Sequence, residues 1–544
     1  MAFSAAMTPR LVQLRTPVRA GRVTLVRGPM QMAAGNHVTL ACPPLGVASL
    51  AGALRAHDVP VTLVDAVGLD PFRVITRGGF LRVGIDDDAI AAAIPADTML
   101  IGVSCMFSEE WPLVRATIEA IARRHPGVPI VLGGEHATAL PEHALAACPH
   151  VAACALGEGE QTIIELAYAI AEGASLDTVP GLVIRAEGGP TRTTGRRRIA
   201  DLTSIPRPAW DLVPMEAYLA NGLGYGVDRG RSVPLLATRG CPYRCTFCSS
   251  PTMWTTKWSA RSPDDVLDEM LDGVERYRAR NFDFYDLTAV IRRDWILELC
   301  RKIVERGLRV TWQIPAGTRS EAIDHEVATW LRRAGCTNLA YAPESGSPAV
   351  LERVRKKISL DVMKRSMRDA VAAGLHVKAN LIVGFPDETA AEAMQTVRFC
   401  RELARIGIDD VNVTPFCPYP GTEDFRALVA KGRIGPLDDA YFDALGCYSD
   451  LSASASWCEH MDERAIARFR WQAMAEFYGR SFVHRPRRVI DVARSVVTGR
   501  QETRLDKAVS DIVTRHPAGR RVVSAVRAVA RRTRLASDIS ARDS

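Results

Sequence analysis

The sequence predicts an α/β protein with a Rossmann-like, doubly wound domain first, a partial (β/α)6 barrel of the TIM type second and a mostly helical region last. Three observations support this prediction. Short apolar strands alternate with helical segments over residues 21–185, the alternation begins again over 233–430, and the last hundred residues are helical in pattern and basic. The length of 544 residues fits two or three domains.

In the first domain, strands are expected where aliphatic and β-branched residues run together. They lie at 22–26, 61–66, 99–106, 130–134 and 153–160, with helices such as 45–57 and 111–125 between them. Such alternation predicts a parallel sheet with helices on both faces and a ligand site at the carboxyl ends of the strands. Residues 1–20 are expected to form a flexible tail. The N-terminus has scattered arginines and no continuous apolar segment, so it does not match a secretory signal.

Residues 186–232 are rich in Arg, Gly and Pro, and we expect them to form a linker. The barrel of 233–430 follows, with strands expected at 233–238, 282–287, 309–314, 338–343, 377–385 and 409–416 and with helices such as 262–280 between them. The active site of such a barrel lies at the C-terminal ends of its strands. Residues 431–544 are expected to form a helical region that caps the substrate pocket.

Composition limits the function classes. The formal net charge of +7 over this length is too weak a bias to indicate a nucleic-acid partner. No apolar run reaches about 18 residues, so no membrane span is expected. The thirteen cysteines occur without a secretory signal, which favours reduced thiols in the cytoplasm and a metal or redox role for any cluster of them.

Three of these cysteines, Cys241, Cys245 and Cys248, stand together in "TRGCPYRCTFCSS" (238–250), directly after the first barrel strand. Thiolates suit zinc or iron–sulfur clusters. Structural zinc usually takes four protein ligands in two pairs, and no second Cys or His pair follows at the usual distance. Three thiolates can hold three irons of a four-iron cluster and leave the fourth iron open. Incidental buried cysteines are the alternative.

The string "CPYRCTFC" resembles the signature of the radical S-adenosylmethionine superfamily, with Phe247 as the aromatic residue before the last cysteine. The resemblance covers about 233–430. It implies a [4Fe–4S] cluster whose open iron binds S-adenosylmethionine, and cleavage of that molecule by one electron to a 5′-deoxyadenosyl radical. It also implies an external one-electron donor such as flavodoxin or ferredoxin.

Two further segments resemble motifs of the same superfamily. "YAPESGS" (341–347) is similar to the fourth-strand motif, which implies that Glu344 and Ser345 face the ribose or the methionine moiety. "NLIVGFPDET" (380–389) is similar to the fifth-strand motif, which implies that Ile382 packs on adenine, although Asn380 stands where the motif has glycine.

The second strand departs further from the superfamily. "FYDLTAV" (284–290) occupies the place of a Gly-Gly-Glu motif and lacks those glycines, which leaves Asp286 and Thr288 as candidates for the methionine amine. Lys378 is a candidate for the carboxylate or ribose. Ion pairing inside the barrel is the alternative role for Glu344 and Lys378.

The first domain resembles the cobalamin-binding domain that precedes the barrel in one class of this superfamily. The resemblance rests on "PPLGVASLAGALRAHDVPVTLVDA" (43–66), "GGEHATALPE" (133–142) and "LGEGEQT" (156–162), in which glycines let the backbone approach a large flat ring. The cobalamin-binding candidates are Pro44, Leu45, Gly46, Ser104, Gly133, Gly134, Glu135, His136, Gly157, Glu158 and Gly159.

The string Asp-x-His-x-x-Gly, which supplies a lower axial histidine in many cobalamin proteins, is absent. We therefore predict that no histidine binds the cobalt and that the dimethylbenzimidazole is displaced as well. His136 is expected to be a loop contact rather than a ligand. A degenerate flavodoxin-like scaffold that binds nothing is the alternative for the whole domain.

Together the resemblances imply an enzyme that methylates an unactivated carbon of a small-molecule or lipid-like substrate, through methylcobalamin and a 5′-deoxyadenosyl radical. Oxidative cyclisation or rearrangement without methyl transfer, as in the anaerobic cyclase of bacteriochlorophyll synthesis, is one alternative. A non-catalytic cobalamin sensor or carrier is another. A radical tRNA methylthiotransferase would carry a second cysteine set, and Cys417, Cys447 and Cys458 are too scattered for one, so core packing is expected for them.

One C-terminal segment suggests a further partner. Residues 519–535 can form a helix with Val522, Val526 and Val529 on one side and arginines on the other. This is the pattern of a helix lying on an anionic membrane surface, and an ordinary solvated helix packed on the barrel is the alternative.

Overall fold

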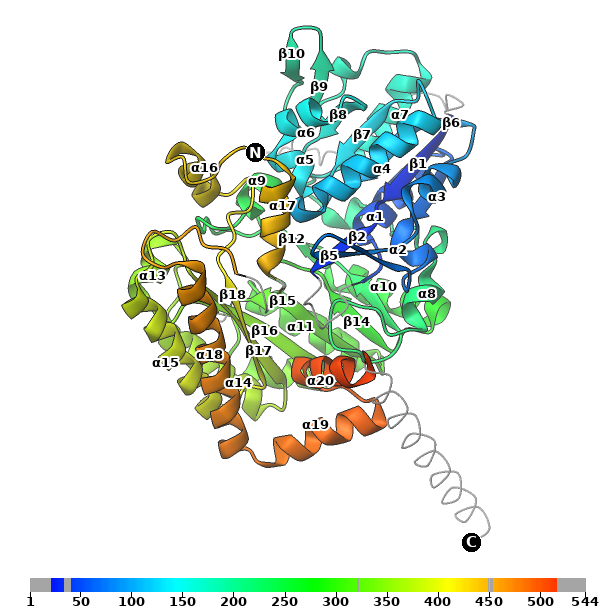
Figure 1. Ribbon diagram of the computed structural model, residues 1–544. Coiled ribbons are helices and arrows are strands. Elements are labelled where there is room, and N and C mark those ends of the chain that lie inside the picture. Colours follow the sequence, from blue (N-terminus) through cyan, green and yellow to red (C-terminus); the bar gives the residue numbers. More distant parts are fainter. Residues whose placement is uncertain are drawn as a thin grey trace, which may run out of the picture.

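Two parallel sheets follow one another along the chain in the computed structural model (Figure 1). The structure describes residues 21–33, 41–196, 198–319, 322–448, 450 and 454–515. The doubly wound domain, the partial barrel and the helical region come in the predicted order, so the predicted fold class is confirmed. No helix in the described part of the chain is long and apolar enough to span a membrane.

The first sheet has the strand order β10-β9-β8-β7-β6-β1-β3. Its strands from β8 to β3 are parallel, and β9 and β10 form an antiparallel hairpin at the edge. The strands are β1 (Arg22–Arg27), β3 (Val61–Asp65), β6 (Thr98–Ser104), β7 (Ile130–Gly133), β8 (Val151–Ala155), β9 (Leu182–Ala186) and β10 (Gly189–Arg192).

Helices cover both faces of this sheet, as predicted. Leu25 packs with α1 (Leu45–Arg55) and α7 (Glu160–Ala171), whereas its neighbour Val26 packs with α3 (Asp87–Ala92) and α4 (Trp111–Arg124). Successive residues of a strand point to opposite faces, so the two clusters lie on opposite sides. Shorter helices complete the domain, namely α2 (Ala66–Leu69), η1 (Ser108–Glu110), α5 (Glu135–Ala139), α6 (Pro141–Ala147) and η2 (Leu176–Thr178).

Two features differ from the sequence-based expectation. A small antiparallel sheet of β2 (Met30–Ala33), β4 (Val74–Arg77) and β5 (Phe80–Val83) stands beside the first domain. The range expected as a linker is packed: it contains β10 of the first sheet and then η3 (Leu202–Ser204), η4 (Trp210–Leu212) and α8 (Met215–Leu219). Trp210 and Tyr218 are 5% and 0% exposed, so this segment is part of the core.

The second sheet is the barrel wall, with six parallel strands in sequence order. Among the described residues the pairing runs from β11 to β18 and does not close, which agrees with a partial barrel. Its strands are β11 (Ser232–Leu235), β14 (Asn281–Phe284), β15 (Thr311–Thr318), β16 (Cys336–Glu344), β17 (His376–Val383) and β18 (Asp410–Pro415), and β12 (Thr238–Arg239) and β13 (Ser259–Ala260) form a separate two-stranded ribbon.

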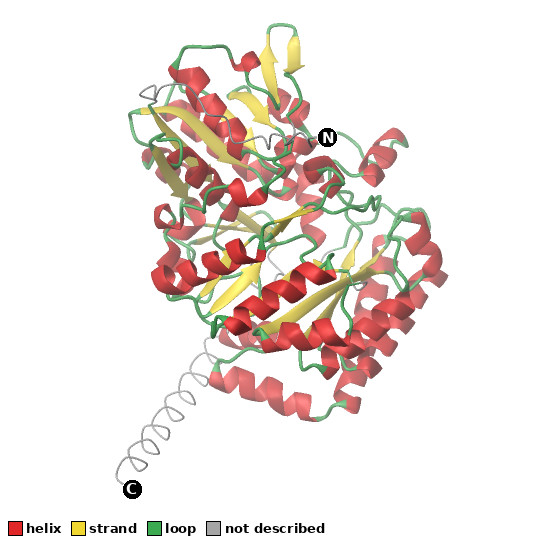
Figure 2. Ribbon diagram, turned by 180° about the vertical axis from the view of Figure 1, so that it is seen from behind, coloured by secondary structure: helices red, strands yellow, loops and turns green. Residues whose placement is uncertain are grey.

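Helices wrap the outside of this wall (Figure 2). They are α10 (Pro263–Tyr277), α11 (Arg293–Glu305), α12 (His325–Arg333), α14 (Leu360–Ala372) and α15 (Ala390–Ile406), with α9 (Ser250–Trp254) and α13 (Pro348–Arg353) in loops. Local signals set their ends. The helix α15 begins at a capping box of Thr389 and Glu392 and ends at Gly407, whose φ is +93°.

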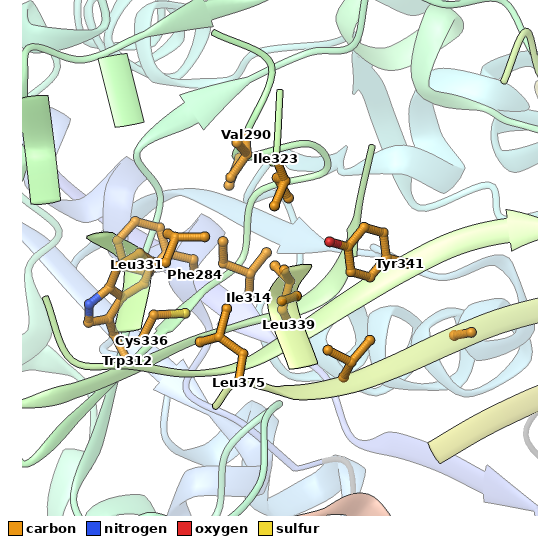
Figure 3. Packing of buried hydrophobic residues seen from close by; sticks show 14 of the residues in the cluster. Phe284, Val290, Trp312, Ile314, Ile323, Leu331, Cys336, Leu339, Tyr341 and Leu375 are labelled. Atoms are coloured by element: carbon orange, nitrogen blue, oxygen red, sulfur yellow. The ribbon is translucent and has the colours of Figure 1, made fainter. Parts of the chain in front are cut away.

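The barrel core forms where strands meet these helices. Figure 3 shows Trp312, Ile314 and Leu339 of the wall gathered with Leu331 of α12. All four side chains are at most 1% exposed. Burying this apolar layer is the main force that holds the helices on the wall.

The C-terminal region is helical, as predicted, and reaches both ends of the barrel. It comprises α16 (Glu423–Ala430), α17 (Asp439–Leu445), η5 (Gly446–Tyr448), α18 (Glu463–His484), α19 (Arg487–Thr498) and α20 (Arg504–Arg515). The backbone N–H of Arg504 donates to the carboxylate of Asp410, the first residue of β18, at 2.7 Å. Helix α20 therefore lies at the N-terminal end of the barrel strands (Figure 1). The predicted basic helix of 519–535 falls outside the described residues.

Candidate functional site

The cysteine loop runs from β12 to α9, beyond the C-terminal end of the first barrel strand. Gly240 has a φ of +83°, and a Cβ atom there would lie 2.3 Å from the carbonyl oxygen of Lys257, so a side chain cannot be accommodated directly before Cys241. The hydroxyl of Thr246 donates to Asp424 at 2.9 Å. These contacts fix the start and the middle of the loop.

The three loop thiols are half-buried and unbonded, whereas every other cysteine except Cys42 is buried. Burial raises the pKa of Cys245, and it raises the pKa of Cys248 to about 12. Coordination to a metal deprotonates such a thiol outright. In the described part of the chain no three His, Cys, Asp or Glu side chains close around a single metal ion. A four-iron cluster needs no such closure, because each of the three thiolates would bind a different iron.

Charged side chains stand beside this loop. Glu344 ends β16 in the left-handed region, with a φ of +64°, and accepts a hydrogen bond from Lys356 Nζ at 2.7 Å. Both side chains are 10% exposed, and Lys356 Nζ lies 5.9 Å from the centroid of the Phe247 ring. The Arg319 guanidinium lies 3.4 Å from the ring centroid of Tyr243 inside the loop. Glu344 thus forms an ion pair, the role that the sequence left as the alternative to contacting S-adenosylmethionine, and its partner is Lys356.

Three of the S-adenosylmethionine candidates hold the backbone instead of facing open space. Asp286 accepts from the N–H and the hydroxyl of Thr238, at 2.5 and 2.6 Å, and from the N–H of Ala237. Thr288 donates to the carbonyl of Gly240 at 3.3 Å. Asp286 is 0% exposed, and burial raises its pKa to about 6. Asp286 and Thr288 thus hold the backbone that leads into the cysteine loop, at Thr238 and Gly240.

Ser345 is also occupied. Its hydroxyl is 3.1 Å from the hydroxyl of Thr396 on α15 and accepts from the N–H of Ser347 at 3.1 Å. The side chain is 0% exposed. Ser345 therefore anchors the turn after β16 to α15. The sequence could not predict where this side chain points, because its direction depends on the conformation of the turn.

Strand β17 separates two of the candidates. Ile382, near its C-terminal end, packs in the same apolar cluster as Phe247. Lys378 lies near the N-terminal end of the strand and lines a cavity with Asp410 and Arg504 at the opposite end of the barrel. Burial lowers the pKa of Lys378 to about 7. The structure therefore does not bring Lys378 to the cysteine loop, because four residues of an extended strand span more than 10 Å of barrel wall, on the order of 3.3 Å per residue.

The C-terminal edge of the first sheet gathers the other candidates. Ser104 pairs with Gly133 on one side and with Arg27 on the other, and Arg27 pairs with Asp65. Arg27 is held 3.3 Å from Asp65 and donates to the hydroxyl of Tyr218 at 3.0 Å. Four parallel strands thus end at one edge of the sheet, where three of them carry a polar side chain and the fourth ends in glycine.

The glycines at this edge have two different roles. A Cβ atom on Gly46, which follows Pro44 and Leu45 at the start of α1, or on Gly133 would meet nothing within 4 Å. A Cβ atom on Gly134 would lie 2.4 Å from the carbonyl oxygen of Cys105. Gly46 and Gly133 leave room for a ligand, while Gly134 is required by its own turn.

The loop after β8 faces the barrel domain. Gly157 has a φ of +68°, and its N–H donates to the Thr138 hydroxyl oxygen at 3.0 Å. A Cβ atom on Gly157 would lie 3.5 Å from the carbonyl of Met253 in α9, and one on Gly159 would lie 3.0 Å from Leu50. This loop is therefore packed between the two domains.

Ion pairs and a hydrogen bond join the two domains at the cysteine loop. Arg239 lies 3.1 Å from Glu158 and 2.5 Å from Glu160, and each of these three side chains is at most 8% exposed. At the other end of the loop, the Ser249 hydroxyl donates to Glu135. Glu135 and Glu158, both cobalamin candidates by sequence, thus hold the cysteine loop against the first domain.

His136 is a core residue. Its ring is 0% exposed, stacks on Trp111 with centroids 4.8 Å apart and meets the edge of Phe442 at 5.5 Å. Nδ1 is 3.0 Å from the Ser108 hydroxyl, and burial lowers the pKa of the ring to about 3. His136 therefore stabilises the domain from within and does not face the ligand edge.

Comparison with known proteins agrees with this geometry. Residues 235–400 match the radical SAM superfamily, and residues 32–167 match the B12 binding domain. An uncharacterised methyltransferase of Pyrococcus horikoshii is 30% identical over 84% of this chain and 92% of its own length. This chain belongs to the cobalamin-binding radical S-adenosylmethionine enzymes. It therefore uses a [4Fe–4S] cluster, S-adenosylmethionine and cobalamin.

Two more similarities frame this radical S-adenosylmethionine enzyme. The anaerobic magnesium-protoporphyrin IX monomethyl ester cyclase of Rubrivivax gelatinosus is 28% identical over 72% of this chain and 67% of its own length. A solved radical S-adenosylmethionine methyltransferase of Kitasatospora setae, with tryptophan and an S-adenosylmethionine analogue bound, superposes with a TM-score of 0.60 over 75% of this chain and 76% of that one. At 20% identity the second comparison supports the fold alone.

The side chains of this enzyme fit both metal cofactors. Three half-exposed thiols on one loop are the soft donors that an iron–sulfur cluster takes, and Lys356 and Arg319 supply positive charge beside them. The open space at Gly46 and Gly133 suits the approach of a large ring to the backbone. We propose Cys241, Cys245 and Cys248 as the cluster ligands.

Sequence reasoning missed several residues of this site. Arg239 precedes the cysteine motif and Arg27 ends the first strand, but an arginine in either place has many possible partners. Glu109 and Glu110 follow β6, and burial raises the pKa of Glu109 to about 7 and that of Glu110 to about 8. The only signal for them was their position just beyond the carboxyl end of a predicted strand.

Proposed function

We propose that this enzyme transfers a methyl group to an unactivated carbon of a small-molecule or lipid-like substrate. The observation that carries the proposal is the junction itself. The cysteine loop and the segment after β8, to which we assign different cofactors, are held together by Arg239, Glu158 and Glu160. The methyltransferase from Pyrococcus horikoshii, which is similar over most of its length, supports methyl transfer.

When bound, the cofactors supply a 5′-deoxyadenosyl radical and a transferable methyl group, and a one-electron donor is required. The chain's own residues position them. Glu344 and Lys356 offer a carboxylate and an ammonium beside the cysteine loop, which suits the polar ends of S-adenosylmethionine. Ile382 offers an apolar surface next to Phe247 for adenine. Asp286 and Thr288 hold the loop in shape.

Apolar side chains near the same strand ends support an apolar substrate. Met106 and Phe107, which follow β6, are 40% and 54% exposed, Leu287, which follows β14, is 44% exposed, and Tyr448 of η5 is 44% exposed. Exposed apolar side chains that follow the strand ends on which a ligand is expected are suited to contact an apolar molecule. A corrin ring and a hydrophobic substrate would both cover them.

The test is a product balance. Enzyme reconstituted with iron, sulfide and cobalamin is given S-adenosylmethionine, a one-electron reductant and candidate substrates. Methyl transfer to carbon by this route yields S-adenosylhomocysteine and 5′-deoxyadenosine in equal amounts, with label from a methyl-labelled donor in the product. Formation of 5′-deoxyadenosine without S-adenosylhomocysteine supports the oxidative cyclase alternative, which the cyclase of Rubrivivax gelatinosus favours. No cleavage at all would support a cobalamin sensor or carrier.

We also propose that the C-terminal region contacts an anionic membrane surface. Helix α19 turns Arg488 and Ser495 inward, at 7% and 4% exposure, and leaves Val489 and Ile490 55% and 60% exposed. Arg494 on the same helix has a side chain that is 71% exposed. An outward apolar stripe beside basic groups suits a membrane with anionic headgroups.

Co-sedimentation with anionic and with neutral vesicles tests this contact. Binding to anionic vesicles only is expected, and the double variant V489S/I490S should reduce it at least several-fold. Loss of binding on deletion of 519–544 would place the contact in that segment. Equal recovery with both kinds of vesicle, or none with either, would contradict the proposal.

A further inference from the structure

Two cysteines that the sequence separates by an entire helical segment meet in the fold. Cys417 follows β18, Cys447 lies in η5, and their sulfur atoms are 3.6 Å apart. Each residue is 6% exposed. Neither belongs to the cysteine loop, and core packing alone was expected for both. Two sulfurs at this separation need to approach by only about 1.5 Å to reach the length of a disulfide bond.

The two thiols form an unequal pair. The hydrogen bond between the sulfurs raises the pKa of Cys417 and lowers the pKa of Cys447. The charge of the buried Arg470 guanidinium favours the thiolate at both positions, while Glu109 opposes it at Cys417 and Asp450 opposes it at Cys447. Cys447 is thus the better nucleophile and Cys417 the better proton donor, which is the division of roles that thiol oxidation uses.

We propose that Cys417 and Cys447 are a redox modification site that a small peroxide converts reversibly into an intramolecular disulfide. The Cys447 thiolate attacks one peroxide oxygen, breaks the O–O bond and becomes a sulfenic acid as hydroxide leaves. The Cys417 sulfur then attacks the Cys447 sulfur, and the S–O bond breaks with loss of water. Both electrons come from the two sulfurs, and peroxide is the oxidant that is reduced.

The disulfide would act on the region between the domains. Tyr448, next to Cys447, is 44% exposed and lies 6.3 Å from Tyr419, which is two residues beyond Cys417. The chain between the two cysteines contains α17, whose Phe442 packs against His136 of the first domain. A bond between Cys417 and Cys447 would therefore fix η5 and α17 relative to the end of β18. The disulfide would thereby restrict movement of the barrel's C-terminal end relative to the first domain.

The experiment uses full-length holoenzyme under anaerobic conditions. One sample receives hydrogen peroxide in small molar excess, and another receives diamide, which oxidises thiols without supplying peroxide to the iron–sulfur cluster. Remaining thiols are alkylated after denaturation, and peptides are mapped without reduction. We expect both oxidants to produce a peptide pair linked through Cys417 and Cys447, to remove two alkylation sites per chain and to be reversed by dithiothreitol. The bond should also raise the midpoint of thermal unfolding by roughly 4 °C or more.

The variants C417A and C447A provide the mechanism test. Oxidised C417A should accumulate a sulfenic acid at Cys447 that a dimedone probe captures, whereas oxidised C447A should show little label at Cys417. Cys148 and Cys154 are also buried near one another, but no hydrogen bond joins their sulfurs in the part of the chain that the structure describes. They are the internal control and should stay reduced. Full alkylation of Cys417 and Cys447 after either oxidant, with no linked peptide, would overturn the proposal.

Discussion

Arg239 and Glu158 are 81 residues apart in sequence, yet Arg239 Nη1 and Glu158 Oε1 lie 3.1 Å apart. The same guanidinium reaches Glu160 at 2.5 Å. Arg239 immediately precedes the glycine that opens the cysteine loop, and the two glutamates belong to the cobalamin-domain motif. One buried cation therefore fixes the spacing of the two cofactor loops.

Replacing Arg239 should uncouple cleavage of S-adenosylmethionine from transfer of the methyl group to the substrate. The variant R239M leaves the buried Glu160 without its cation and leaves Glu158 with Arg198, at 3.4 Å, as its remaining cation, so we expect a loss of stability of about 3 kcal/mol. Burial alone would raise the pKa of Glu160, but the charge and hydrogen bond of Arg239 hold it below its ordinary value, and this support disappears in the variant. Calorimetry measures the loss, and the ratio of 5′-deoxyadenosine to methylated product should rise.

A matched control exists on the surface. Arg55 and Asp211 pair at 2.9 Å with side chains that are 48% and 58% exposed. The variant R55M should cost less than about 1 kcal/mol and leave the product ratio unchanged. A product ratio in R239M equal to that of the parent enzyme would show that the ion pairs of Arg239 with Glu158 and Glu160 do not set the cofactor geometry.

The cysteine triad should be separable from the cobalamin site. Alanine at Cys241, Cys245 or Cys248 removes one cluster thiolate, so we expect the iron content and the visible absorption of the cluster to fall several-fold. Cobalt content should remain within the error of the parent protein, because the glycine edge is untouched. Cys42, the other half-exposed cysteine, provides the control variant C42A, which should keep its iron. Iron retained in all three triad variants would contradict the assignment.

The carboxyl pair after β6 should make stability depend on pH near neutrality. Burial raises the pKa of Glu109 to about 7 and that of Glu110 to about 8, above the ordinary glutamate value of about 4.3. The folded state therefore binds more protons than the unfolded state between these values, so stability falls as the pH rises through this window. The double variant E109Q/E110Q should flatten the pH dependence of the unfolding midpoint between about pH 6 and pH 8. An unchanged slope would show that these carboxyls titrate normally.

Lys378 should prove irrelevant to S-adenosylmethionine. It lines the cavity at the N-terminal end of the barrel with Asp410 and Arg504, far from the cysteine loop. The variant K378M should leave the dissociation constant of S-adenosylmethionine within about twofold of the parent value, because its side chain faces the wrong end of the barrel. Burial lowers the pKa of Lys378 to about 7, so below pH 7 the parent protein must bury a charged ammonium at this position. Removal of the ammonium in K378M should therefore raise the unfolding midpoint below pH 7. A tenfold weaker binding in K378M would contradict this placement.

The sequence by itself determined the order of the domains, five strands of the first sheet, all six strands of the barrel and the cysteine motif. These features depend on local patterns: the period of apolar residues, the glycines at turns and three thiols within eight positions. The edge hairpin of β9 and β10 was missed. The first of these strands is a five-residue run at the end of the predicted domain, and the second is a short polar strand that resembles a linker. The small sheet of β2, β4 and β5 was also missed, because each of its strands is only four residues long and too short to show a periodic pattern.

Tertiary structure alone decided what the polar side chains do. Asp286 and Ser345 lie within the right motifs, but both turn to the backbone because buried polar groups must find hydrogen-bond partners. Lys378 lies on the right strand and at the wrong end of the barrel, which only the strand register shows. The clamp of Arg239 and the pairing of Cys417 with Cys447 join distant segments. Local pattern fixes the backbone, whereas contacts across long sequence separations exist only after the two domains have packed together.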